Sequence, residues 1–213
     1  KHTMNNYENQ IFKIPIESCD YPQASEFVIK SIEDIIEHAI EKGENKIILN
    51  TNLRNGLPME NINKIAGPIV EAWAGELFES ISNQNGNRWN LVHSETCSRL
   101  GMSDIILQFK KSTTFGSVIT ANVDSKATAE DLEKSGKSPN ITSFARIRSA
   151  YVKDADFIFV ILSLKHKVFC QRNTKTGLRS GHIHPHRKNK IIIKEKFSNP
   201  IVIIENYLRS IKW

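Results

Sequence analysis

Two segments that are otherwise typical of buried strands carry acidic residues, and one of them also carries a lysine. Asp104 precedes an apolar run in "SDIILQF", while Asp124 and Lys126 stand near the end of "SVITANVDSKA". Because side chains alternate along a strand, Asp124 and Lys126 should point to the same face of a sheet. If residues 103–110 and 117–126 pair as an antiparallel hairpin, Asp104 and Asp124 should meet at one end of it.

Two neighbouring carboxylates repel each other unless a cation neutralises them. Mg²⁺ is suited to this role, because it binds one or two protein carboxylates together with water and phosphate oxygens. A lysine beside them can stabilise an attacking hydroxide and the charge that develops on phosphorus. The Asp…Asp-x-Lys pattern therefore favours phosphodiester hydrolysis, although most Asp-x-Lys tripeptides are simple ion pairs.

A third acid stands on a helix that the apolar spacing predicts over residues 68–86, with Pro68 in its first turn. Glu76 lies three residues after Trp73 and seven after Ile69, so it should border the buried stripe. The alternative is a boundary acid satisfied by solvent or by a lysine. Glu71 falls on a more polar side, and we expect it to be solvated.

Four segments in this order resemble the PD-(D/E)XK nuclease superfamily, and more specifically type II restriction endonucleases of the EcoRV-like, blunt-cutting branch. They are "AGELFE" (74–79), "SDIILQF" (103–109), "VDSKA" (123–127) and "SPNITSFARI" (138–147). The resemblance covers residues 67–165. Ser103 replaces the proline that usually precedes the first aspartate.

The resemblance implies a role for each matching residue. Asp104, Asp124 and the backbone carbonyl of Ser125 would hold Mg²⁺ against the scissile phosphate. Lys126 would position or activate the attacking water, and Glu76 would act in an outer shell or bind a second metal. The segment after the catalytic strand would form a helix that approaches DNA, with Lys137, Asn140, Thr142, Ser143 and Arg146 available to phosphates or bases.

Positive charge is concentrated in residues 165–196, which hold ten Lys or Arg and one acid, whereas the whole chain carries a net charge of +6. Such a basic stretch on a nearly neutral body favours a polyanionic partner, although a solvated lysine-rich face is the alternative. The loop 178–189 has side chains that bind base edges or phosphates, and we expect it to contact DNA. Two other interpretations stay open: a solvated loop, or a transition-metal site built from His182, His184 and His186. The expected DNA contacts in this region are Arg179, His182, His184, Arg187 and Lys188.

The length of 213 residues and 39% hydrophobic content fit one globular domain. We expect residues 1–3 to be a cloning remnant and 4–213 a single endonuclease domain, with a catalytic core (67–165), a basic DNA-contacting region (166–197) and a C-terminal helix (198–213) capped by Ser198. No apolar run is long enough to span a membrane, and the start lacks a signal-peptide pattern. The three cysteines have no paired spacing. Together with the resemblance, these features favour a prokaryotic cytoplasmic protein.

The order of elements predicts an α/β fold with a central mixed sheet flanked by helices, as in restriction endonucleases. Helices are expected over 25–43, 68–86 and 138–155, and strands within 88–95, 103–111, 117–127, 156–166, 167–173 and 190–196. The resulting hypothesis is a Mg²⁺-dependent, sequence-specific endonuclease of double-stranded DNA. A palindromic site cut on both strands would require a homodimer. The alternatives are a structure- or end-directed nuclease, such as a junction resolvase, and a DNA-binding protein that does not cut.

Overall fold

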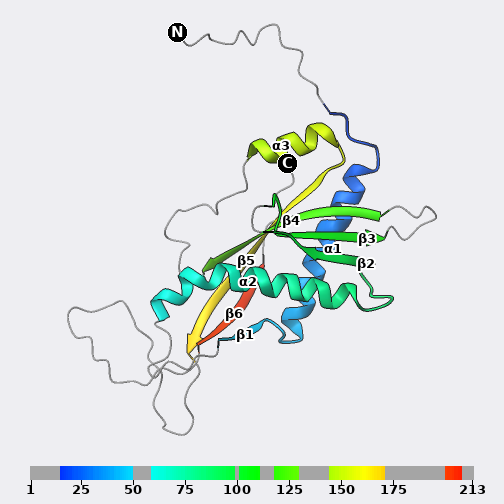
Figure 1. Cartoon of the computed structure of the whole chain (residues 1–213). Coiled ribbons are helices and arrows are strands. Elements are labelled where there is room, and N and C mark those ends of the chain that lie inside the picture. The colour runs from blue at the N-terminus through cyan, green and yellow to red at the C-terminus, as the bar shows by residue number, and fades with distance from the viewer. Residues whose placement is uncertain are drawn as a thin grey trace, which may run out of the picture.

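The computed structural model of the chain describes residues 15–49, 59–98, 101–110, 118–129, 144–170 and 200–207. They form a six-stranded mixed sheet with three helices (Figure 1), which confirms the predicted α/β class. The strand order is β1-β6-β5-β4-β3-β2, and the neighbouring strands are antiparallel except for the parallel pair β4 and β5. The strands are β1 (Lys46–Ile48), β2 (Leu91–Thr96), β3 (Ile105–Lys110), β4 (Val118–Ala129), β5 (Ile158–Cys170) and β6 (Pro200–Tyr207).

Helices α1 (Tyr21–Glu41) and α2 (Met59–Ser82) pack against one face of this sheet. Their buried stripes, which include Ile32 and Phe78, join strand residues such as Leu107 in the main hydrophobic core. Burial of such side chains stabilises the domain by about 25 cal/mol per Å² of apolar surface. Gly43 follows α1 with a φ of +74°, the left-handed conformation that glycine commonly adopts after the end of a helix.

Helix α2 begins before the predicted start, so Pro68 lies inside it and not in its first turn. The physical reason is tertiary packing. Ala66, Val70 and Ala74 are four residues apart and fully buried, so the apolar stripe continues on the N-terminal side of the proline. This packing offsets the backbone hydrogen bond that a proline in a helix removes.

The C-terminal helix expected over 198–213 is wrong for the part that the structure describes, because residues 200–207 form β6. This strand pairs antiparallel with β5 on one side and with β1 on the other. Its run of β-branched residues, 201–204, is typical of a strand with two neighbours. The prediction of two separate strands at 156–166 and 167–173 is also wrong, because the single strand β5 runs without a break through residue 170.

Helix α3 (Phe144–Lys153) confirms the middle of the third predicted helix, whereas Ser138 and Pro139 lie outside the described residues. It packs through Ile147 on Phe159 and Ile161 of β5, in a second and smaller apolar cluster. In the view of Figure 1, α3 lies at the top, above strands β2 to β4, and α2 crosses the middle of the view. Among the described helices, none is long and apolar enough to cross a membrane.

Candidate active site

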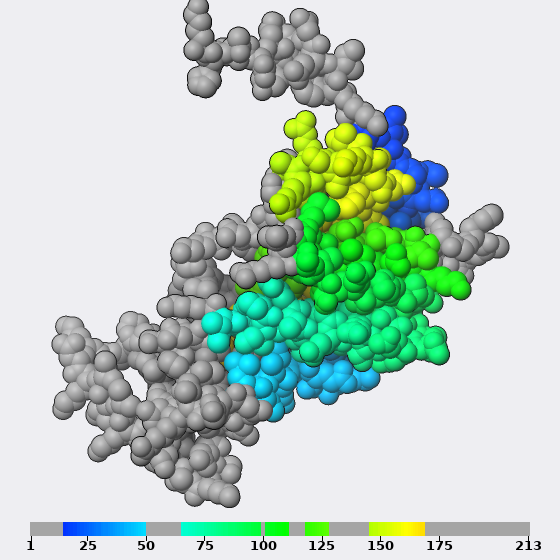
Figure 2. Space-filling model, viewed as in Figure 1, coloured from blue at the N-terminus to red at the C-terminus, as the bar shows by residue number. Residues whose placement is uncertain are grey.

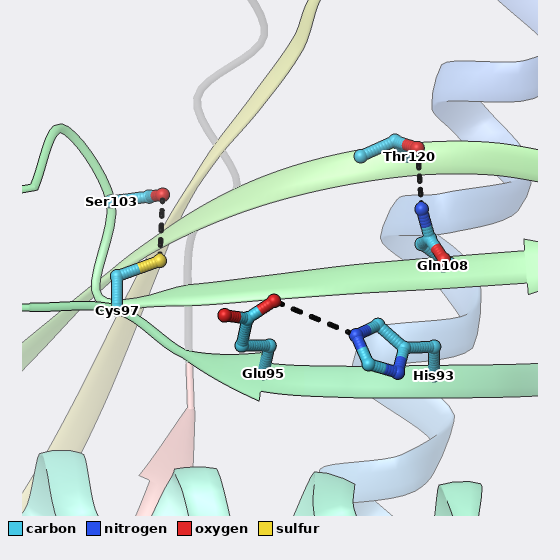
Figure 3. Close-up of polar contacts among 6 residues, drawn as sticks. All are labelled: His93, Glu95, Cys97, Ser103, Gln108 and Thr120. Atoms are coloured by element: carbon cyan, nitrogen blue, oxygen red, sulfur yellow. Dashed lines mark hydrogen bonds and ion pairs between the residues drawn. The ribbon is translucent and has the colours of Figure 1, made fainter.

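Asp104 is fixed by its backbone at the start of β3, between β2 and β4. Its N–H donates to the carbonyl of Val123 at 2.9 Å, and its carbonyl accepts from the N–H of Cys97 at 2.7 Å. The Sγ of Cys97 lies 3.7 Å from the hydroxyl of Ser103, the residue that replaces the family's proline (Figure 3). Both neighbouring strands therefore set the position of the Asp104 side chain.

The predicted hairpin is confirmed, because β3 pairs antiparallel with β4 and Ile105 is the partner of Val123. This register places Asp104 opposite Asp124. On β4, the Lys126 ammonium lies 2.6 Å from Oδ1 of Asp124, so these two side chains share a face as the alternation predicts. The Asp124 side chain is only 2% exposed, and that of Lys126 is 22% exposed.

Ser125 joins the two aspartates through its backbone. Its N–H donates to Oδ2 of Asp104 at 2.8 Å. In a strand, the N–H and the C=O of one residue point toward the same neighbouring strand. The carbonyl of Ser125 is thus on the side of β4 where Asp104 lies, which fits the role expected from the resemblance.

The electrostatics of the site oppose a full negative charge on Asp104. Burial raises the pKa of this carboxyl above its ordinary value, and Asp124 raises it further. The hydrogen bond from the Ser125 N–H and the charge of Lys126 act in the opposite direction without cancelling the shift. A bound cation would remove this conflict by favouring both ionised aspartates.

The residues present fit a hard divalent cation. Oδ2 of Asp124 is buried and has no hydrogen-bond partner among the described residues, although a buried carboxylate oxygen is normally satisfied. The part of the chain that the structure describes holds no cluster of three or more His, Cys, Asp or Glu for a metal. Two carboxylates suit Mg²⁺, which takes few protein carboxylates and completes its shell with water and phosphate oxygens.

On α2, Glu71 is an acid whose charge interacts with both aspartates of the site. Burial is the main cause that raises the pKa of Glu71, and Asp104 and Asp124 raise it further while Lys126 lowers it. Glu76 is exposed. The expectation of a solvated Glu71 is therefore corrected.

Glu71 differs from the expectation because another face of α2 is buried than the one predicted. The fully buried stripe of α2 includes Val70, Ala74 and Phe78. Glu71 lies three residues before Ala74 and seven before Phe78, so it borders this stripe. Trp73, from which the position of Glu76 was predicted, is only partly buried. The small apolar residue Ala74, between Val70 and Phe78, was the sequence feature that indicates the buried face of α2.

The predicted DNA-contacting residues are only partly described. Arg146 and Arg148 are both exposed on α3. Lys137, Asn140, Thr142 and Ser143 lie outside the described residues. The same is true of Arg179, His182, His184, Arg187 and Lys188, so the loop 178–189 and its three interpretations stay predictions.

This chain is similar to known restriction enzymes. The model of the type II restriction endonuclease HpaI family matches residues 8–193. The type II restriction enzyme HpaI of Haemophilus parainfluenzae is 55% identical to this chain over 175 residues, which cover 82% of this chain and 68% of that enzyme. The range matched by the family model includes Glu71 and the whole of the site built from β3 and β4.

Proposed function

From the premise that this chain belongs to the type II restriction endonuclease HpaI family, we propose that Asp104, Asp124 and Lys126 hydrolyse phosphodiester bonds of double-stranded DNA in the presence of Mg²⁺. The observation that carries the proposal is the convergence of two carboxylates and one ammonium at the end of the β3–β4 hairpin. This convergence also supports a place for the family in the PD-(D/E)XK superfamily.

Asp104, Asp124 and the carbonyl of Ser125 would hold the metal. When bound there, Mg²⁺ supplies positive charge that polarises the phosphate and favours ionisation of a nearby water. Asp124 suits this role, since one of its oxygens has no partner among the described residues. Asp104 suits it because its backbone and one carboxylate oxygen are already fixed by hydrogen bonds.

Lys126 would orient the attacking water and stabilise the negative charge that develops on the phosphate oxygens. The water oxygen attacks phosphorus, and the bond from phosphorus to the 3′ oxygen breaks. The water gives up a proton to solvent, and the 3′ oxygen takes one up. The products are a 5′-phosphate and a 3′-hydroxyl. Glu71 replaces Glu76 as the outer acid of this site and adds negative charge near the metal.

We further propose that the protein acts as a homodimer on a palindromic DNA site. Two equal cuts in opposite strands require two active sites related by a two-fold axis. The basic region 166–197 and Arg146 would supply phosphate and base contacts. Blunt ends are the cleavage pattern that the EcoRV-like resemblance favours.

A plasmid digest tests this function directly. Purified protein should cut plasmid DNA into discrete fragments with Mg²⁺ and should leave it intact with EDTA. Ligation of the fragments without end repair would verify the 5′-phosphate and 3′-hydroxyl ends. Cleavage only at junctions or free ends would instead identify a structure-directed nuclease. Binding without any cleavage would refute the catalytic assignment.

A further inference from the structure

Helix α3 covers the sheet face on which Asp124 lies. Ile147 packs on Phe159 and Ile161 of β5. In the parallel pairing of β4 and β5, Ile161 is the partner of Asp124. Paired residues of neighbouring strands point to the same face, so Asp124 and Ile161 share a face with α3.

A groove of about 440 Å³ is lined by one side of α3 and by the turn that precedes Asp104. Met102, which lies two residues before Asp104, lines the groove and also packs against the Ile147 cluster. Figure 2 shows α3, in yellow-green, directly adjoining the green strand region on one face of the molecule. The residues that line this α3 groove are Met102, Ala145, Arg146, Ser149, Ala150 and Lys153.

The groove has charge at its two ends and small side chains between them. Arg146 and Lys153 are exposed and seven residues apart, which corresponds to about 10 Å along the helix axis. The hydroxyl of Ser149 donates to the carbonyl of Ala145 at 2.8 Å, so the middle of the groove offers little polarity. Residues 144–153 contain three cations and no acid.

This pattern fits the backbone of a nucleic acid strand. Deoxyribose is uncharged and largely apolar, and each sugar lies between two phosphates. One strand of a duplex advances about 3.4 Å per nucleotide along the axis, so the distance from Arg146 to Lys153 corresponds to roughly three nucleotides. Exposed cations at the ends of the groove complement phosphates, and the small residues leave space for sugars.

We infer that the α3 groove binds the sugar–phosphate backbone of the DNA strand that leads into the active site. The inference rests on the proposed function, because the active site must act on that strand. It adds Met102, Ser149 and Lys153 to the substrate site. A second copy of this chain is the competing occupant, and the experiment must separate the two.

Lys153→Glu tests the charged end of the groove, and Lys30→Glu is its matched control. Lys30 is exposed on α1, which packs against the opposite face of the sheet, and both changes alter the net charge equally. The measurement is fluorescence anisotropy of a short labelled duplex of arbitrary sequence, titrated at several salt concentrations without Mg²⁺. Lys153→Glu should weaken binding more than Lys30→Glu and should make the log–log salt slope shallower by about one unit.

Ala145→Trp tests the shape of the groove without a change in charge. A filled groove should weaken DNA binding and leave the salt slope unchanged. Circular dichroism verifies that each variant folds. If the reversal of charge in Lys153→Glu prevents folding, the variant Lys153→Gln is measured in its place. Equal binding by Lys153→Glu and Lys30→Glu, together with normal binding by Ala145→Trp, would overturn the inference.

Sedimentation of the same variants identifies the competing occupant. If Ala145→Trp changes the oligomeric state while DNA affinity stays normal, the groove binds a second copy and the inference is wrong. The plasmid digest with the unaltered protein keeps the two proposals apart. If the unaltered protein cleaves DNA but the groove variants bind DNA normally, only the inference about the groove is refuted. If the groove variants bind DNA more weakly but the unaltered protein does not cleave, only the catalytic function is refuted.

Discussion

The Lys126 ammonium and the Asp124 carboxylate form an ion pair of 2.6 Å between two side chains that both point to one face of β4. The lysine contacts one oxygen of Asp124, while the other has no partner among the described residues. Burial of a charge without a partner is costly, so the pair has a structural role in addition to the catalytic role that we propose for it. Each role predicts a different result for the same substitution.

Lys126→Ala should reduce the cleavage rate by about 10²- to 10³-fold, because the ammonium acts on charge that develops only in the transition state. DNA affinity should change much less. Single-turnover cleavage and anisotropy binding measure the two effects separately. Equal losses in rate and affinity would make Lys126 a phosphate clamp.

The same substitution should also destabilise the metal-free protein. Breaking a buried ion pair by removal of one partner costs about 3 kcal/mol, because the remaining charge stays buried. The double variant Asp124→Asn with Lys126→Met should recover most of that stability, but it should not recover cleavage. Urea unfolding in EDTA measures the free energies. If the double variant is no more stable than Lys126→Ala, Asp124 is not the group that Lys126 neutralises.

Asp124→Asn should abolish cleavage, since it removes the charge from the proposed metal ligand while the side chain keeps its size. The loss should exceed the loss for Lys126→Ala. Asp34→Asn on α1 is a control with the same chemical change away from the site. Isothermal titration with Mg²⁺ should show weaker binding for Asp124→Asn only. Cleavage near the normal rate would refute the assignment of this aspartate.

The part of the site that the sequence predicted correctly depends on local rules. The alternation of side chains placed Asp124 and Lys126 together, and a hairpin of adjacent strands placed Asp104 opposite Asp124. These relationships need no knowledge of the remaining fold. They follow from the period of two residues in a strand and from the short connection between β3 and β4.

The errors arose where distant packing decides the result. Which glutamate of α2, Glu71 or Glu76, lies nearer the aspartates depends on the face of α2 that packs on the sheet. Ala74 is fully buried on that face, whereas the larger Trp73 is only partly buried. The segment 200–207 has apolar spacing that also suits a helix, but β1 and β5 both offer it strand partners. Sequence periodicity alone does not show that such partners exist.

The stability of the metal-free protein should fall as the pH rises through the range in which Asp104 ionises. Folding raises the pKa of Asp104, mainly through burial, so the native state holds its proton more tightly than the unfolded chain does. The resulting contribution to the free energy of unfolding is fully present below the unfolded pKa and is lost as the pH passes the raised value. Glu71 contributes with the same sign.

Asp104→Asn should reduce this pH dependence, because it removes one of the two carboxyl groups whose pKa is raised. The amide oxygen can still accept the hydrogen bond from the Ser125 N–H, so the local geometry is retained. Thermal melting in EDTA from mildly acidic to neutral pH measures the effect, with Asp34→Asn as the control. An identical pH profile for Asp104→Asn and the unaltered protein would show that Asp104 does not titrate in the native state as its surroundings predict.

Glu71→Gln and Glu76→Gln on the same helix separate the structural assignment from the one that the sequence favoured. Glu71 is half-buried and interacts with the charges of Asp104, Asp124 and Lys126, whereas Glu76 is exposed. Glu71→Gln should therefore raise the Mg²⁺ concentration needed for half-maximal cleavage, because it removes negative charge near the metal. Glu76→Gln should leave the Mg²⁺ dependence unchanged. The readout is the cleavage rate as a function of Mg²⁺ concentration at constant ionic strength. The reverse result, with an effect of Glu76→Gln alone, would restore the assignment made from the sequence and remove Glu71 from the site.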